Sequence, residues 1–181
     1  MLFQYQTSRL VLKILSPQYA QEVLTFQEND KDLFEQYEID RYPDFYTLEH
    51  QEKILQCEYK LALKLSTVRF YVFLKDNPQT LIGTVCLYDI SNSYSRCEIG
   101  YKFASNYHHQ GYAYETLEKA IDIAFRDLHL HRICARVQET NIASIHLLEN
   151  LGFEKEGVCR HHLKIQGVWT DHLQYSLLSI E

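Results

Sequence analysis

The sequence predicts one mixed α/β domain in which a mainly antiparallel sheet is flanked by helices. The chain has 181 residues, and a domain of that length buries a sizeable core without disulfides or metals. Runs that alternate apolar and polar residues, as half-buried strands do, recur along the chain. Between residues 95 and 137 a strand, a helix and a second strand follow one another. This order predicts at least one parallel crossover within the antiparallel sheet.

Hydrophobic periodicity defines the expected elements of the first half of the chain. Ile54, Leu55, Leu61 and Leu65 recur at helical spacing, and an Asp-Asn-Pro turn signal at 76–78 joins two strands into a hairpin. The expected elements are a strand at 8–15, a helix from Pro17 to about residue 28, an irregular stretch at 29–47, a helix at 48–65, and strands at 69–74 and 81–90.

The second half is marked by capping residues as well as by periodicity. An apolar stripe through Leu117 and Ala120 predicts a helix, Asn141 suits a helix N-cap, and Gly152 suits a left-handed C-terminal cap. The expected elements are a strand at 95–104, helices at 112–127 and 141–151, and strands at 131–137, 154–164 and 171–178. No repeat or linker divides the chain, so we expect a single domain over residues 1–181.

Composition excludes several classes of partner. The net charge of −6 argues against nucleic-acid binding, which needs clustered Lys and Arg. Five scattered cysteines without a C-x-x-C pair suit free thiols in a reducing compartment, and the histidines lack companions at metal-ligand spacing. The N-terminal segment has no apolar run long enough for a signal peptide or a membrane span. We therefore expect a cytoplasmic protein with no nucleic-acid, membrane or metal partner, and leave the oligomeric state open, a homodimer included.

Two segments carry the pattern of a binding site. HHQGYAYE, at 108–115, places Gly111 and Ala113 where a loop enters a helix. Free N–H groups and the helix dipole bind phosphate at such a point, although an ordinary helix start has the same pattern. Asn141 and Ser144 lie on one face at the start of the next helix, where Asn141 also fits a simple N-cap and Ser144 a surface residue.

The order of three motifs separates these alternatives. They are EIGY at 98–101, QGYAYE at 110–115, and N-x-x-S-x-x-L-L-E-N-L-G-F at 141–153. In this order the sequence resembles the GNAT superfamily, and within it the RimJ/RimL-like branch of ribosomal-protein N-terminal acetyltransferases. The resemblance runs from TSRLVLK through LIGTVCL to GVWTDHLQYSLL. It implies transfer of acetyl from acetyl-CoA to a primary amine, a protein N-terminus or a small amine, by direct attack in a ternary complex.

The resemblance also implies where the cofactor binds. Two neighbouring strands of the family splay apart, and the pantetheine arm lies in the gap. Backbone groups of the fourth strand would bind the pantetheine, amides of the loop would hold the pyrophosphate, and Asn141 would contact the pantetheine end. The implied residues are Tyr101, Lys102, Phe103, His108, His109, Gln110, Gly111, Tyr112, Ala113, Tyr114, Asn141 and Ser144.

The sequence departs from the family pattern at three positions. His108 stands where the family has Arg or Gln, and His109 stands where Gly is common. The backbone amides can bind phosphate whatever side chains these positions carry, so we expect phosphate binding to be retained. Leu148 occupies the helix position at which many members carry a tyrosine, so a tyrosine acid at that position is excluded.

Acetyl transfer to an amine needs a base for the ammonium proton and an acid for the departing thiolate. The resemblance makes Glu98 the candidate base, acting directly or through a water, and Ser144 the candidate acid. A backbone N–H near Phe103 would polarise the thioester carbonyl. The alternatives are an ion-paired or solvent-facing Glu98 and a Ser144 that only binds the cofactor.

The segment at 28–46 forms one wall of the acceptor site in the family. Its acidic residues, interleaved with aromatic ones, are Glu28, Asp30, Asp32, Glu35, Glu38, Asp40 and Asp44. We expect such a wall to favour a cationic amine or a peptide N-terminus, or else to be a solvated helix face. Two rival functions remain open: a non-catalytic acyl-CoA-binding module, and a polyamine- or antibiotic-modifying acetyltransferase.

Overall fold

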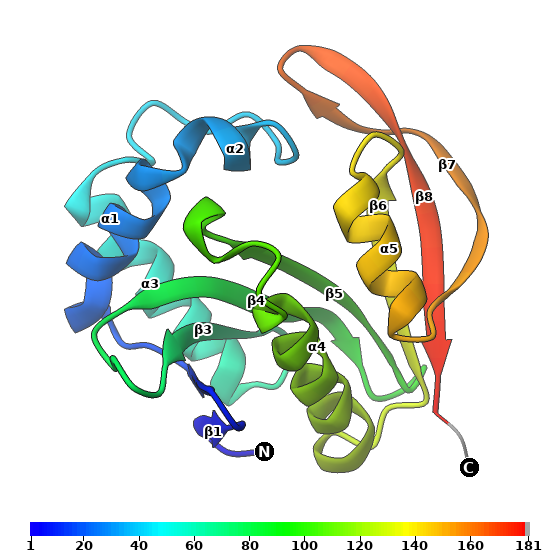
Figure 1. The fold of residues 1–181 in the computed structure, drawn as a ribbon, viewed down its shortest axis with the longest axis horizontal. Helices are drawn as coiled ribbons and strands as arrows, with labels where there is room; N and C mark the ends of the chain where they lie inside the picture. The colour runs from blue at the N-terminus through cyan, green and yellow to red at the C-terminus, as the bar shows by residue number, and fades with distance from the viewer. Residues whose placement is uncertain (180–181) are drawn as a thin grey trace.

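The computed structural model describes residues 1–179, whose eight strands form one sheet in the order β1-β2-β3-β4-β5-β6-β8-β7 (Figure 1). Every neighbouring pair is antiparallel except β5 and β6, which are parallel. The strands are β1 (Gln4–Gln6), β2 (Leu10–Lys13), β3 (Val68–Leu74), β4 (Leu81–Ser91), β5 (Arg96–Phe103), β6 (Arg132–Gln138), β7 (Glu154–Ile165) and β8 (Val168–Leu178). The predicted fold class, with its crossover, is confirmed.

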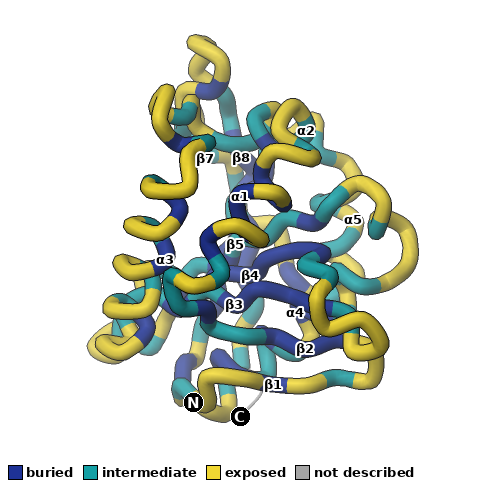
Figure 2. Tube along the Cα trace, turned by 90° about the vertical axis from the view of Figure 1, so that its left-hand side faces the viewer, coloured by how far each residue is buried: buried dark blue, intermediate teal, exposed yellow. Residues whose placement is uncertain are grey.

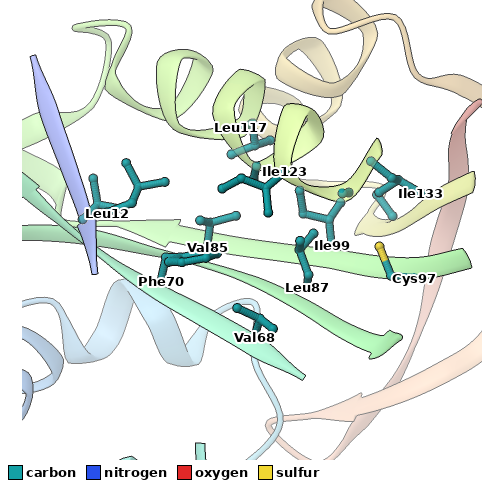
Figure 3. Packing of buried hydrophobic residues seen from close by; sticks show 14 of the residues in the cluster. Leu12, Val68, Phe70, Val85, Leu87, Cys97, Ile99, Leu117, Ile123 and Ile133 are labelled. Carbon is teal, nitrogen blue, oxygen red and sulfur yellow. The ribbon is translucent and has the colours of Figure 1, made fainter. Parts of the chain in front are cut away.

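Helices pack on both faces of the sheet. They are α1 (Ala20–Asn29), α2 (Lys31–Glu35), α3 (Leu48–Leu63), α4 (Tyr112–Asp122) and α5 (Ile142–Asn150). Leu117 of α4 and Ile123 just after it pack over Val85 and Ile99 of the sheet, which together belong to the larger core cluster (Figure 3). A smaller cluster joins α1 and α3 to Tyr71 and Phe73 on the opposite face. Figure 2 shows the central strands buried and the outer sides of the helices exposed.

The elements that the sequence analysis missed are short. β1 has three residues and α2 has five, so neither is long enough to show a period, and each is anchored by one buried aromatic ring, Tyr5 or Phe34. The helix at α4 continues as a π-helical turn over Ile123–Asp127. Within residues 1–179, no helix is long and apolar enough to cross a membrane.

The parallel pair β5–β6 separates soon after it begins. Strand pairing covers only Arg96 to Glu98 on β5 and Arg132 to Cys134 on β6, yet both strands continue beyond it. In Figure 1 the two strands diverge toward α2 and α5. Because no strand among residues 1–179 pairs with β5 on this side after Glu98, its backbone is left able to pair with an extended ligand. The splayed strands expected from the resemblance are therefore present.

Candidate active site

A cavity of about 920 Å³ occupies the region where β5 and β6 part, and it is lined from α2, β5, the loop before α4, and α5. Most of the predicted cofactor residues line it: Tyr101, Lys102, Phe103, His108, His109, Gly111, Tyr112, Ala113, Tyr114, Asn141 and Ser144. Gln110 points elsewhere and donates its side-chain amide to the Asn106 carbonyl at 2.8 Å. One continuous cavity thus brings together segments that are far apart in the sequence.

The loop before α4 has the backbone shape of an anion site. Gly111 is the N-cap of α4 and has φ of +78°, so the first amides of the helix open into the cavity. His109 is also left-handed, with φ of +58°, which is costly for a residue with a side chain and explains why glycine is common there. His108 turns its ring away from the loop: Nε2 donates to the Phe103 carbonyl at 2.8 Å.

Arg9, which the sequence analysis did not select, adds a positive charge beside this loop. Its Nη1 donates to the Gln110 carbonyl at 2.9 Å, and its Nη2 lies 3.3 Å from the point where a Gly111 side chain would begin. Glu115 fixes the guanidinium by accepting from Arg9 Nε at 2.7 Å. In the sequence Arg9 could be noticed only as part of the TSRL motif, and no local pattern indicates that this motif lies next to residues 110–115.

Glu115 also binds the chain that carries Arg9. It accepts from the Thr7 and Ser8 hydroxyls at 2.6 and 2.8 Å and from the Arg9 backbone N–H at 2.8 Å. Burial raises the pKa of Glu115, but the hydrogen bonds from Thr7, Arg9 and Ser8 outweigh it and lower the pKa from 4.5 to about 2. The carboxylate therefore stabilises the folded state at neutral pH.

This arrangement predicts acid-sensitive stability. Because the folded-state pKa is depressed, the contribution is complete above about pH 4.5 and is lost as pH falls toward 2. Because solvent screens the interactions of this partly exposed carboxylate, the loss is on the order of 1 to 2 kcal/mol. We expect Glu115→Gln to lower the free energy of unfolding at pH 7 and to flatten its decline between pH 5 and pH 3. Urea unfolding at these pH values measures both. Glu118→Gln, an exposed change on the same helix, is the control, and equal pH slopes in all three proteins would contradict the assignment.

Glu98 does not line the cavity, and its carboxylate is engaged. Arg136 Nη1 donates to it in an ion pair, and the Tyr88 hydroxyl donates to it at 3.2 Å. Arg136 and Tyr88 themselves line the cavity. The ion-paired alternative is thus the geometry that the structure shows, and any contact of Glu98 with the acceptor passes beside these two side chains or through a water.

Ser144 lies on the other side of β5. Side chains alternate along a strand, and Ile99, Tyr101 and Phe103 belong to the cluster under α4, so Glu98 and Lys102 face the opposite side. Asn141 caps α5 by accepting from the Ser144 N–H at 3.1 Å, as expected for an N-cap. The Ser144 hydroxyl is 2.5 Å from the Tyr101 hydroxyl. A group in the gap would therefore have Glu98 toward one face and Ser144 toward the other.

Of the two alternatives for residues 28–46, the structure shows a solvated face and not an acidic wall of the acceptor site. Of the seven acidic residues at 28–46, Glu38 is the one that lines the cavity, and two cations bind it. Phe34 is buried, which turns the neighbouring acidic side chains of α2 outward. The cationic side chains that line the cavity are Arg41, Arg69, Lys102 and Arg136. Burial lowers the pKa of Lys102 to about 8, against the opposing effect of Glu38 at 2.9 Å.

Two buried polar atoms on β6 fit a cofactor with amide groups. Arg136 Nε and Gln138 Oε1 have no hydrogen-bond partner among the described residues, and both side chains line the cavity. Buried polar atoms are almost always paired in native proteins. A pantetheine arm, which carries amide N–H and C=O groups, would provide partners for a donor and an acceptor placed in this way.

Comparison with known proteins agrees with this geometry. Residues 9–154 match the family described as "Acetyltransferase (GNAT) domain". The chain is 36% identical over 161 residues to the probable N-acetyltransferase YjcK of Bacillus subtilis, covering 88% of each chain. It is 36% identical over 110 residues to the ribosomal protein uS5-alanine N-acetyltransferase of Escherichia coli, covering 60% of this chain and 57% of that one. The crystal structure of ribosomal-protein-S5-alanine acetyltransferase from Vibrio fischeri has a TM-score of 0.90 at 26% identity, covering 97% of this chain and 96% of that one.

The chain belongs to the GNAT acetyltransferase family and is an N-acetyltransferase. Its relatives include ribosomal-protein-alanine acetyltransferases of the RimJ/RimL-like branch, so the family resemblance deduced from the three motifs is confirmed. Enzymes of this family take the acetyl group from acetyl-CoA and give it to an amine.

Proposed function

We propose that this N-acetyltransferase acetylates the α-amino group of a protein or peptide, with residues 1–181 acting as a single cytoplasmic domain. The cations on the acceptor side are the observation that supports this choice. The four cationic side chains that line the cavity pair with three carboxylates, those of Glu38, Glu58 and Glu98. This leaves a surplus of one positive charge, and each of these carboxylates is already engaged, so the site disfavours a second ammonium group on the acceptor. A peptide N-terminus carries one ammonium next to carbonyl groups, which accept hydrogen bonds from such side chains. A polyamine carries several cations.

Binding of acetyl-CoA would use groups from four segments. The amides from His109 to Tyr114, in the loop and the first turn of α4, and the guanidinium of Arg9 suit the pyrophosphate. The free edge of β5 at Tyr101 and Lys102, together with Arg136 and Gln138 of β6, suits the pantetheine. The Phe103 carbonyl is already used by His108, which leaves the Phe103 N–H for the cofactor.

The proposed reaction is a direct transfer. The amine nitrogen loses a proton toward Glu98, by way of a water beside Tyr88 and Arg136, and its lone pair attacks the thioester carbon. The new C–N bond forms, the C–S bond breaks, and the sulfur takes the Ser144 proton. The ammonium gives up two protons in all, one before the attack and one after the C–N bond has formed; one is matched by the proton that sulfur gains, and the other leaves through Glu98 to solvent. No change of oxidation state occurs, so no redox partner is required.

An acceptor screen tests the proposal. Equal concentrations of short peptides with free N-termini, the same peptides blocked at the N-terminus, spermidine and an aminoglycoside are incubated with acetyl-CoA. Mass spectrometry detects the product and a thiol reagent measures CoA release. We expect acetylation of the free peptides at the α-amino group. Preference for spermidine would contradict the acceptor class, and no CoA release with any amine would favour a non-catalytic acyl-CoA-binding module.

A further inference from the structure

The hydroxyls of Tyr101 and Ser144 meet across the gap between β5 and α5. Their oxygen atoms are 2.5 Å apart, and the Tyr101 hydroxyl also lies 3.4 Å from the Ser144 carbonyl oxygen. Pairing of β5 with β6 has already ended at Glu98. The contact is therefore a side-chain bridge over the region where the strands have parted, and both residues line the cavity.

The direction of this hydrogen bond decides where the serine proton points. Burial raises the pKa of Tyr101 to about 12, against the lowering effect of the Ser144 hydrogen bond. The phenol thus keeps its proton at neutral pH, and a phenol is a stronger donor than an alkyl hydroxyl. When Tyr101 donates to Ser144 Oγ, the serine's own proton is left free for another acceptor.

We propose that Tyr101 is a positioning residue whose hydroxyl donates to Ser144 Oγ and so directs the serine proton to the departing sulfur. The inference rests on the proposed acid role of Ser144. As the C–S bond breaks, its electron pair goes to sulfur and the Ser144 proton follows. The Tyr101 hydrogen bond stabilises the negative charge that develops on the serine oxygen until solvent returns a proton.

A purely structural role predicts a different pattern. Tyr101 would then only hold β5 and α5 together, and removal of any other hydrogen bond that holds α5 in place would change kcat in a similar way. The structure offers a matched comparison, because the Tyr175 hydroxyl of β8 donates to Glu149 of α5 at 3.0 Å. Tyr175→Phe removes this hydrogen bond to the same helix and leaves the contacts of Ser144 unchanged.

The test is a double-mutant cycle on turnover, with acetyl-CoA affinity measured by calorimetry. We expect Tyr101→Phe to lower kcat about tenfold, Ser144→Ala to lower it about a hundredfold, and the double variant to match Ser144→Ala alone. Acetyl-CoA affinity should stay within about twofold in each. Tyr175→Phe should leave kcat unchanged, and Ser144→Thr, which keeps a hydroxyl, should retain sensitivity to Tyr101→Phe.

Several results would overturn the inference. Independent losses in the two single variants, equal effects of Tyr101→Phe and Tyr175→Phe, or an unchanged kcat in Ser144→Ala would each exclude the positioning role while the enzyme remains an acetyltransferase. Absence of turnover by the wild-type protein with every amine in the screen would instead overturn the proposed function, and the role of Tyr101 with it.

Discussion

Replacement of Gly111 by Glu is expected to abolish the stabilisation of the protein by acetyl-CoA. For the wild-type protein, ligand at a hundredfold excess over Kd adds about 2.7 kcal/mol to the free energy of unfolding. In a chain of this size, that gain raises Tm by roughly 5 to 10 °C. The Gly111 backbone begins α4 with φ of +78°. A side chain there is strained, and a carboxylate would lie at the proposed pyrophosphate position and repel it.

Strain and charge can be separated in this experiment. Gly167 in the β7–β8 turn has the same φ of +78° and open space around it, so Gly167→Glu repeats the strain and the charge away from the loop. Gly111→Ala introduces the strain without the charge. We expect Gly167→Glu to keep the full thermal shift and Gly111→Ala to keep part of it. A folded Gly111→Glu protein with the wild-type shift would show that the pyrophosphate binds elsewhere.

The sequence was most informative where the pattern is local. Periodicity located the longer helices and strands, and Asn141 and Gly152 were recognised as caps because capping depends on residues within one turn. The structure bears out both caps: Asn141 accepts from the Ser144 N–H, and Gly152 has φ of +84°. The strand–helix–strand order predicted the parallel crossover, and the order of the three motifs then identified the family, which implied the gap beside β5.

What could not be predicted depends on contacts between distant residues. Arg9 meets Glu115 across 106 positions, and Tyr101 meets Ser144 across 43. No periodicity connects such pairs. The sequence left the segment at 28–46 open between an acidic wall and a solvated face for a related reason: composition counts charges, but the burial of neighbours such as Phe34 decides which of them face the cavity. Glu98 was selected by its place on the strand, and its partner Arg136 comes from another strand.

Replacement of Glu98 by Gln is expected to lower the rate of acetyl transfer by about 10²- to 10⁴-fold at neutral pH, the usual range for loss of a general base. Acetyl-CoA affinity should barely change, because Glu98 faces away from the loop and from Ser144. Glutamine keeps the shape and can still accept from Tyr88, but it cannot take a proton. Initial rates with saturating acetyl-CoA and a peptide acceptor measure the effect.

The ion pair with Arg136 offers a second explanation for such a loss, and stability distinguishes the two. Removing one partner of a half-buried pair leaves the other charge poorly compensated, so Glu98→Gln alone should lower Tm. A double variant that also carries Arg136→Gln no longer has the uncompensated arginine charge, so it should regain part of the lost Tm. Arg136 is also proposed to contact the pantetheine, so rates are compared at saturating acetyl-CoA. If Glu98 matters only through the pair, this rate recovers together with Tm in the double variant. If Glu98 accepts the proton, Tm recovers and the rate stays low.

The acidity of the acceptor gives a readout that no structural role would alter. An amine with an unusually acidic ammonium group is already partly deprotonated at neutral pH, so less proton removal is asked of the enzyme and the loss caused by Glu98→Gln should shrink. A purely structural defect would reduce the rate equally for both kinds of acceptor. Near-full turnover by Glu98→Gln from about pH 6 to about pH 9 would mean that water or another residue removes the proton. In that event the base assignment is wrong even though the chain remains a GNAT acetyltransferase. Lys102, which lies on the same face of β5 and whose pKa burial lowers to about 8, then becomes the group to replace next.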